Sequence, residues 1–173
     1  MTQRLFCRER HQIVTSIYPD PNLNDELLNK LNEFKDHDWK MAYGTNVNAR
    51  MSKWHMHKDE DFQENIMKIY DWIMDLLSET YDDFPVDMFE LYESWFAWYN
   101  EGDKTRIHDH RYCPFSFVYF INAPDESSSL YFATSNIEFK PEPGRVIIFP
   151  GNVEHYVPTN KSNGRIVLAG NIK

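Results

Sequence analysis

The pattern of apolar and turn residues changes near Phe89, and this change limits the fold of the chain more than any other feature of the sequence. Beyond it, short apolar runs with the composition of β-strands alternate with turn residues. The runs are "FELYESWFAWYN", "PFSFVYFIN", "SSLYFAT", "GRVIIFPG", "EHYVPT" and "RIVLAGN". The turns between them contain Glu101-Gly102, Ala123-Pro124-Asp125, Pro141-Glu142-Pro143-Gly144 and Ser162-Asn163-Gly164. Many short strands joined by such turns predict antiparallel sheets arranged as a sandwich or jelly roll.

The first half of the chain instead contains two segments with helical periodicity. Apolar residues recur at helical spacing in "PNLNDELLNKLNEF" and form a continuous stripe in "DFQENIMKIYDWIMDLLSETY". The expected caps are Asn22 or Asn24 in the first segment and an Asp61–Glu64 capping box in the second. Helices followed by strands predict an α+β, mainly β fold. We expect one domain over residues 1–173, with a helical support region at 1–88 and a β core at 89–173.

Charge and hydropathy argue against several classes of protein. The formal net charge is −9, whereas a phosphate backbone favours a basic surface, so nucleic acid is not an expected partner. No apolar run approaches the roughly 20 residues that span a bilayer, and "MTQRLFCRERHQ" lacks the apolar stretch of a secretory signal. We therefore expect a cytoplasmic protein without a membrane partner, in which Cys7 and Cys113 are reduced thiols.

The segment "RIHDH" is the strongest candidate for a metal site. On a strand, residues i and i+2 point to the same face, so His108 and His110 would converge while Asp109 faces away. Two imidazoles on one face form half of a transition-metal site. His155 in "FPGNVEHYVP" follows a Pro-Gly turn in a β-type run and is the expected third ligand.

A second histidine pair has the same spacing but a different context. His55 and His57 lie in "KWHMHKDED", among charged residues, just before a predicted helix, and have no downstream partner in a comparable frame. We therefore expect this pair to be surface polar residues, as we do His11 and His37.

The second half of the chain also resembles the double-stranded β-helix of the Fe(II)/2-oxoglutarate-dependent oxygenases. The resemblance covers about Glu93 to Lys173, through four blocks in the order of the family. These blocks are "SWFAWYNEGDKTRIHDH", "SFVYFIN", "PEPGRVIIFPGNVEHYVPT" and "GRIVLAGN". Within the superfamily the chain is most similar to small oxygenase-like proteins common in phages, and more distantly to prolyl hydroxylases. The resemblance implies a double-stranded β-helix, or jelly roll, backed by the amino-terminal helices.

The resemblance also implies roles for individual residues. Arg165, ten residues after His155, matches the base that binds the distal carboxylate of 2-oxoglutarate, a role that suits the planar fork of a guanidinium. Tyr99 and Tyr119 match positions that hydrogen-bond the same cosubstrate. The positions that match metal ligands are His108, His110 and His155.

Two positions depart from the common pattern of the family. His110 stands where the usual triad of two histidines and one carboxylate has its carboxylate. Three neutral imidazoles leave the metal site one unit more positive, which should change its redox poise and metal preference. Val167 stands where many relatives carry Ser or Thr, so one hydrogen bond to the cosubstrate is missing.

The resemblance therefore implies an Fe(II) enzyme that uses O2 and 2-oxoglutarate to hydroxylate an unreactive C–H bond. A peptide or protein side chain is the favoured substrate, with prolyl as the first expectation, and a small molecule is the second. If the chain is encoded by a phage, its expected location is the cytoplasm of the host.

Two other functions remain open at this level. A small cupin would also begin with glycine, five residues and His-x-His, as "GDKTRIHDH" does, and would bind metal without 2-oxoglutarate. The glutamate that a cupin carries shortly after this motif is missing from "RYCPFSF". A non-catalytic jelly-roll binding or structural protein would keep the fold and use the histidines for packing or for an inert metal. Arg165 discriminates the oxygenase from both alternatives.

Overall fold

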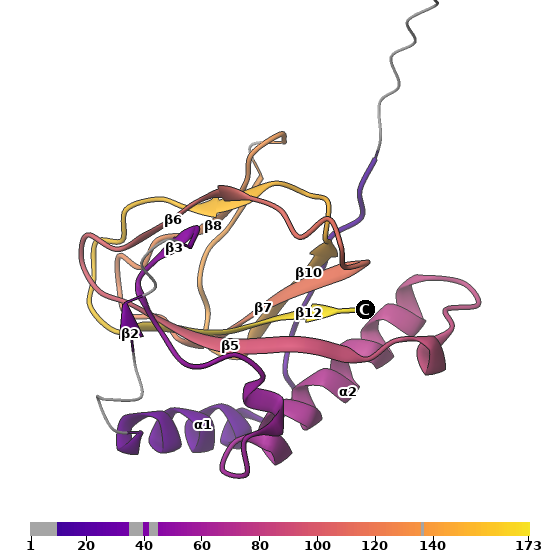
Figure 1. Cartoon of the computed structure of the whole chain (residues 1–173), viewed down its shortest axis with the longest axis horizontal. Helices are drawn as coiled ribbons and strands as arrows, with labels where there is room; N and C mark the ends of the chain where they lie inside the picture. The colour runs from indigo at the N-terminus through magenta and orange to yellow at the C-terminus, as the bar shows by residue number, and fades with distance from the viewer. Residues whose placement is uncertain (1–9, 35–39, 42–44, 136) are drawn as a thin grey trace, which may run out of the picture.

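Two antiparallel β-sheets face each other in the computed structural model of the chain, and two long helices cover the outer face of the larger sheet (Figure 1). The structure describes residues 10–34, 40–41, 45–135 and 137–173. The helices are α1 (Pro21–Glu33) and α2 (Gln63–Thr80), accompanied by the short 3-10 helices η2 (Met56–Lys58) and η3 (Val86–Met88). No helix in these ranges is long and apolar enough to cross a membrane.

The larger sheet has the strand order β1-β10-β7-β12-β5-β4-β2. Its strands are β1 (Val14–Ile17), β10 (Arg145–Pro150), β7 (Phe115–Asn122), β12 (Arg165–Ile172), β5 (Leu91–Tyr99), β4 (Arg50–Met51) and β2 (Lys40–Met41). Strand β12 lies at the centre of the sheet, between β7 and β5, and pairs with both along most of its length.

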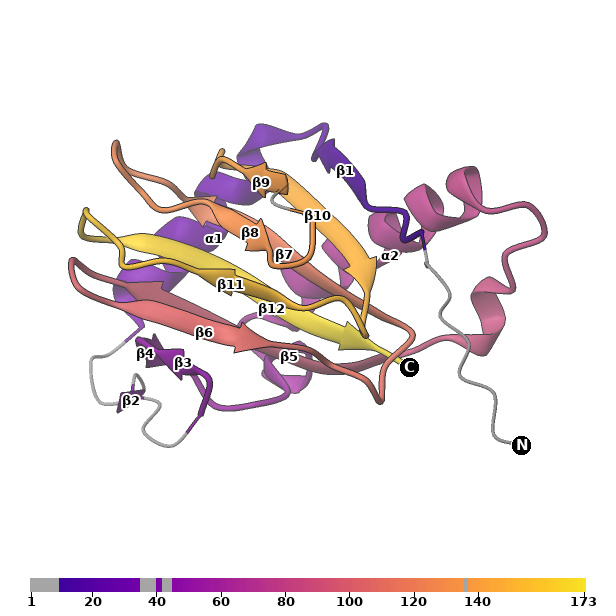
Figure 2. The ribbon, with the colours of Figure 1, turned by 90° about the horizontal axis from the view of Figure 1, so that it is seen from above.

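The smaller sheet has the order β3-β6-β11-β8-β9 and lies over the larger one (Figure 2). Its strands are β3 (Val47–Asn48), β6 (Lys104–His108), β11 (His155–Val157), β8 (Leu130–Phe132) and β9 (Ile137–Phe139). The sheets form a jelly roll, as predicted from the sequence.

Apolar side chains fill two layers, because successive residues of a strand point to opposite faces. On β5, Phe96 packs toward the helices, where its ring lies 5.0 Å from that of Phe62. Trp95, Ala97 and Tyr99 face the space between the two sheets instead. The functional candidates described below lie in this second layer.

Both predicted helices are present, but their caps differ from the prediction. Helix α1 is capped by Asp20, whose Oδ1 accepts a hydrogen bond from the backbone N–H of Asn22 at 3.0 Å. Asn24 is buried, and its amide donates to the carbonyl of Ile121 at 2.8 Å, so it anchors the helix to β7. Helix α2 has no side-chain cap, and Glu64 pairs with Lys68 in the next turn, so the predicted capping box is not formed.

Each of the six predicted β-type runs contains a strand, but the structure has further strands that sequence patterns did not indicate. Strand β1 forms an edge of the larger sheet through pairing with β10. Strand β4 extends the opposite side by pairing with β5, and β3 pairs with β6 in the smaller sheet. The first 88 residues therefore contribute strands to both sheets as well as the helices that cover one of them.

Candidate metal centre and cosubstrate pocket

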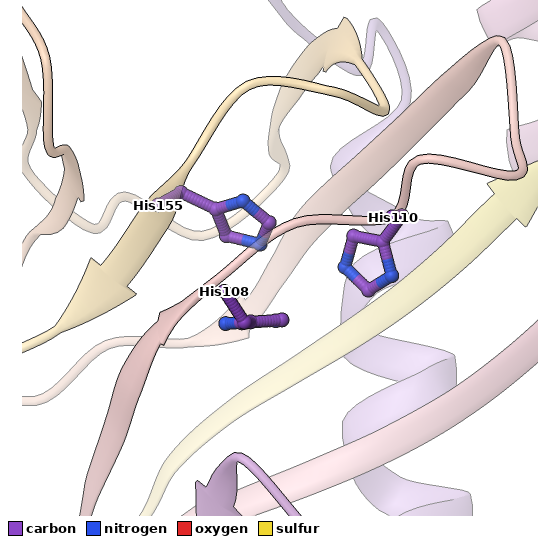
Figure 3. Close-up of side chains that lie close together, drawn as sticks. All are labelled: His108, His110 and His155. Carbon is purple, nitrogen blue, oxygen red and sulfur yellow. The ribbon is translucent and has the colours of Figure 1, made fainter.

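Three histidine side chains from separate positions in the sequence point toward one another between the sheets (Figure 3). His108, His110 and His155 each offer a ring nitrogen, and these nitrogens lie within 4.8 Å of one another. Asp109 is engaged elsewhere, because its carboxylate accepts a hydrogen bond from Nε of Arg111 at 2.6 Å. The arrangement supplies three nitrogen donors suited to one transition-metal ion.

Two different pieces of backbone bring these histidines together. His108 is the last residue of β6, and His155, the first residue of β11, is its direct partner across the ladder. The strand ends there, so His110 lies in the following turn, where its backbone N–H donates to the carbonyl of Gly151 at 2.6 Å. The alternation argument from the sequence therefore does not apply to His110, although its ring still meets the other two.

Hydrogen bonds select the tautomer of two of the three rings. Nδ1 of His108 lies 2.9 Å from the carbonyl of Arg106, and Nδ1 of His155 lies 3.0 Å from that of Val153. A carbonyl can only accept, so each Nδ1 carries the proton and each Nε2 keeps a free lone pair for a metal. The ring of His110 has no hydrogen-bond partner within the part of the chain that the structure describes.

Burial keeps all three imidazoles uncharged at neutral pH. It lowers the pKa of His155 to about 3, with a further lowering by His108 and His110, and it lowers the pKa of His110 to about 4, with a further lowering by His108. Burial also lowers the pKa of His108, against the opposing effect of its hydrogen bond to Arg106. Because only a neutral imidazole binds a metal, the cluster is ready to act as a ligand set at pH 7.

Arg165 is a buried cation that has no anionic partner among the described residues. It begins β12, directly opposite Tyr99 on β5, and is 1% exposed. Its Nε donates to the carbonyl of Ser128 at 3.1 Å, while its Nη1 is buried without a hydrogen-bond partner in the described part of the chain. Burial lowers the pKa of Arg165. An unpaired buried charge is costly, so this guanidinium is suited to bind an anion that the chain does not itself supply.

One cavity between the sheets connects the histidines with Arg165. Its wall includes all three imidazoles and the guanidinium, and apolar side chains form much of the remainder. Other residues that line it include Val47, Trp95, Ala97, Tyr99, Thr105, Val118, Leu130, Phe149, Val157 and Val167. The Tyr99 ring centre lies 4.5 Å from the guanidinium carbon of Arg165, and its hydroxyl lies 2.8 Å from Oγ1 of Thr105. A metal-ligand set and a cation thus share one largely apolar pocket.

The structure does not bring Tyr119 to this pocket, contrary to the role that the sequence suggested. Its neighbours Val118 and Phe120 face the space between the sheets, so Tyr119 faces the helices and packs in the other core layer. Its hydroxyl is buried without a hydrogen-bond partner among the residues that the structure describes, and burial raises the pKa of the phenol. Of the two tyrosines predicted to contact a cosubstrate, only Tyr99 lines the cavity.

The second histidine pair also differs from its prediction. His55 is exposed, as expected, but His57 is buried, and its Nδ1 lies 2.8 Å from Oγ of Ser94. The same hydroxyl accepts the backbone N–H of His57 at 2.9 Å, so this residue fastens η2 to β5. His11 is exposed, Cys113 is buried, and both Cys7 and His37 lie outside the described residues.

Gly151 is a residue of the site that sequence reasoning missed. Its carbonyl accepts from His110, and its N–H donates to the carbonyl of Pro114 at 3.1 Å. A Cβ at this position would lie 2.0 Å from the carbonyl oxygen of Cys113 and 2.5 Å from that of His110. The Pro-Gly pair in "FPGNVEH" was interpreted as a turn, but no sequence signal connected it to the turn that carries His110.

Several solved structures that this chain resembles in fold are named as prolyl hydroxylases. A prolyl-4-hydroxylase from Pseudomonas putida matches with a TM-score of 0.70 at 19% identity, over 94% of this chain and 92% of that one. The viral collagen prolyl hydroxylase of Paramecium bursaria Chlorella virus-1, in its 2-oxoglutarate complex, has a TM-score of 0.65 at 16% identity, covering 95% and 96%. A prolyl hydroxylase from Trichoplax adhaerens, bound to a hypoxia inducible factor peptide fragment, has a TM-score of 0.66 at 14% identity, covering 92% and 82%.

No protein-family model and no curated protein matches the sequence. The structural likeness at these low identities establishes the fold, which is the jelly roll on which 2-oxoglutarate oxygenases are built. The structural match extends along nearly the whole length of the chain. The likeness suggested by the four sequence blocks is therefore confirmed.

Proposed function

We propose that this protein is an Fe(II)- and 2-oxoglutarate-dependent dioxygenase. The observation that carries the proposal is the unpaired guanidinium of Arg165, buried in the same cavity as three uncharged histidines. A cation with a spare donor at one place and a metal-ligand set at another suit a small dicarboxylate that bridges the two. A metal site alone would not require the buried arginine.

The residues present fit a bound Fe(II) ion. Imidazole is a suitable ligand for iron, and the tautomers of His108 and His155 leave Nε2 free to bind it. Fe(II) bound there would supply the oxidising chemistry with O2, by which 2-oxoglutarate is converted to succinate and CO2 and a C–H bond of the substrate is hydroxylated. The third imidazole, from His110, replaces the usual carboxylate and leaves the centre one unit more positive.

The same cavity offers matching contacts for 2-oxoglutarate. Its distal carboxylate would accept hydrogen bonds from Arg165, beside the hydroxyl of Tyr99. Apolar residues such as Val167 and Val118 would exclude water from the chain of methylenes between the two carboxylates. Val167 offers no hydroxyl, so the set of hydrogen bonds is smaller than in relatives with Ser or Thr at this position.

A peptide or protein side chain is the substrate class that the structural neighbours favour. One of them is named as a collagen prolyl hydroxylase, and another holds a peptide fragment of hypoxia inducible factor. We extend that class to this chain as part of the proposal, with a prolyl residue as the first candidate and a small molecule as the second.

Formation of succinate tests the proposal. The purified protein, loaded with Fe(II) without oxygen, is then given 2-oxoglutarate and O2, and succinate is quantified with metal-free protein as the control. We expect slow succinate formation even without substrate, and a rise in melting temperature with 2-oxoglutarate. If neither is observed, a cupin-type metal enzyme or a non-catalytic jelly-roll protein becomes the better interpretation.

A further inference from the structure

The inner face of the larger sheet carries a row of three polar side chains. Glu93 on β5 and Ser116 on β7 flank Asn171 on β12, and each is paired with Asn171 in the strand register. The side-chain amide of Asn171 donates to Oε2 of Glu93 at 2.8 Å, and Oγ of Ser116 donates to Oδ1 of Asn171 at 2.8 Å. Ser116 is 1% exposed and Asn171 is 4% exposed, so burial and hydrogen bonds fix both side chains in the sheet.

The row lies beside the histidine cluster. Residues two apart on a strand share a face, so Glu93 lies on the same side of the sheet as Trp95, about 7 Å along β5. The ring of Trp95 is 6.2 Å from that of His110, centre to centre. Glu93, Asn171 and His110 also line one open cleft, and His110 lines the cosubstrate cavity as well. A molecule in this cleft would therefore lie next to the proposed metal.

The direction of the hydrogen bonds in this row leaves a hydrogen-bond acceptor, the carboxylate of Glu93, at one end. A carboxylate can only accept, so the NH2 group of Asn171 must face Glu93 and its oxygen must face Ser116. Both donors therefore point along the row toward Glu93. Within the described residues Oε1 of Glu93 accepts no hydrogen bond, so it is available to a donor on a ligand.

Glu93 is also the carboxylate of this cleft that lacks a cation. Asp109 and Arg111 bind each other at 2.6 Å, and the ammonium of Lys173 lies 4.8 Å from the ring centre of Tyr92. Within the described ranges no ion pair involves Glu93. A half-buried carboxylate, oriented by Asn171 and left without a cationic partner, is suited to bind a positively charged N–H donor.

We propose that Glu93 is the specificity-determining residue for a substrate that carries an ammonium or guanidinium group, which it binds beside the metal centre. The assignment of this ligand as a substrate rests on the proposed oxygenase function, whereas the binding site itself does not.

The experiment compares matched cationic and neutral probes on the full chain, loaded with Zn(II) and 2-oxoglutarate so that no turnover occurs. N-acetyl-arginine amide is paired with N-acetyl-citrulline amide, and N-acetyl-lysine amide with N-acetyl-norleucine amide. Binding is followed by chemical-shift changes in protein NMR spectra. We expect at least one cation to bind about tenfold more tightly than its neutral partner, with the shifts centred on β5 and β12.

Glu93→Gln removes the charge but keeps the shape, and should abolish that preference while leaving the melting temperature within a few degrees of the wild type. Glu101→Gln, in the exposed turn after β5, is the matched control and should keep the preference. Equal binding of both members of each pair, or a preference that survives Glu93→Gln, would overturn the proposal.

The two proposals fail in different ways. Selective cation binding to the Zn(II) protein, without succinate from the Fe(II) protein, would support the cation site at Glu93 and contradict the proposed oxygenase function. Succinate formation without any cation preference would do the opposite, since Glu93 would then have no part in recognition.

Discussion

His155 stands directly opposite His108 in the ladder between β6 and β11, and the centres of their rings are 4.3 Å apart. Each ring is fixed through Nδ1 by the carbonyl of the residue two positions earlier in the chain. His110 has neither a strand nor a ring hydrogen bond within the described residues to hold it. The candidate site therefore combines two ligands on a rigid ladder with a third that depends on a turn.

The first prediction separates His110 from its neighbour Asp109. His110→Ala should lower metal affinity by at least about tenfold, because a ligand is lost. Asp109→Ala should leave metal content nearly unchanged, since the carboxylate of Asp109 binds Arg111 instead of facing the cluster. Metal content after dialysis against a weak chelator measures both. Loss of metal in Asp109→Ala and retention in His110→Ala would mean that the carboxylate is the true third ligand.

The second prediction concerns the turn that holds His110. Gly151→Ala places a methyl group against the carbonyls of Cys113 and His110, so the turn must shift and take the ligand with it. We expect metal affinity to fall about tenfold, with an altered Co(II) absorption spectrum, while His108 and His155 remain in place.

Gly102→Ala is the control for that substitution. Gly102 has a φ of +89°, and apart from its chain neighbours no described residue has an atom within 4 Å of the point that an alanine methyl would occupy, so alanine there strains the backbone without a collision. It should lower stability by about 1 kcal/mol and leave the Co(II) spectrum unchanged. Identical spectra for Gly151→Ala and the wild type would show that Gly151 does not position His110.

The third prediction tests the role of Arg165. Arg165→Ala should weaken 2-oxoglutarate binding by about 30-fold or more, because the distal carboxylate would lose its buried cation. Metal affinity should stay largely intact, since the guanidinium donates to the carbonyl of Ser128 and lies against the ring of Tyr99. Isothermal titration with each ligand gives both affinities, and Arg145→Ala, which breaks a pair with Glu142 outside the cavity, is the control. Equal losses of metal and 2-oxoglutarate would assign Arg165 a structural role.

Strand alternation predicted that His108 and His110 converge, and the Pro-Gly turn before a β-type run indicated His155, whereas Arg165 was predicted only through the family resemblance. It could not assign Tyr119, because "FSFVYFIN" is apolar at positions that face both core layers, and alternation then gives no face. Nor could it find the buried state of His57, which depends on Ser94, 37 residues away in the sequence. Short strands such as β3 and β4 have two residues each, too few to show a period.

The fourth prediction contrasts the two tyrosines. Tyr99→Phe removes a hydroxyl that lines the cavity and should weaken 2-oxoglutarate binding about threefold to tenfold. Tyr119→Phe should leave that affinity unchanged and stabilise the fold by about 1 kcal/mol, because its buried hydroxyl has no partner among the described residues. Ligand titration and denaturant unfolding measure the two effects. Weaker 2-oxoglutarate binding in Tyr119→Phe would show that this residue does reach the cosubstrate.

The last prediction is a pH dependence of stability that arises from His57. Burial lowers the pKa of His57, and the neighbouring charges of Lys58 and His55 lower it further. Below the unfolded pKa of about 6.5, the unfolded chain therefore binds a proton that the folded protein takes up less readily, so stability falls as pH decreases.

One such proton contributes at most about 1.4 kcal/mol per pH unit to the slope. His57→Gln should flatten the dependence of the unfolding free energy on pH between about 7 and 5, relative to the wild type in the same metal-free state. An identical slope in His57→Gln and the wild type would mean that the buried imidazole of His57 takes up its proton without loss of stability.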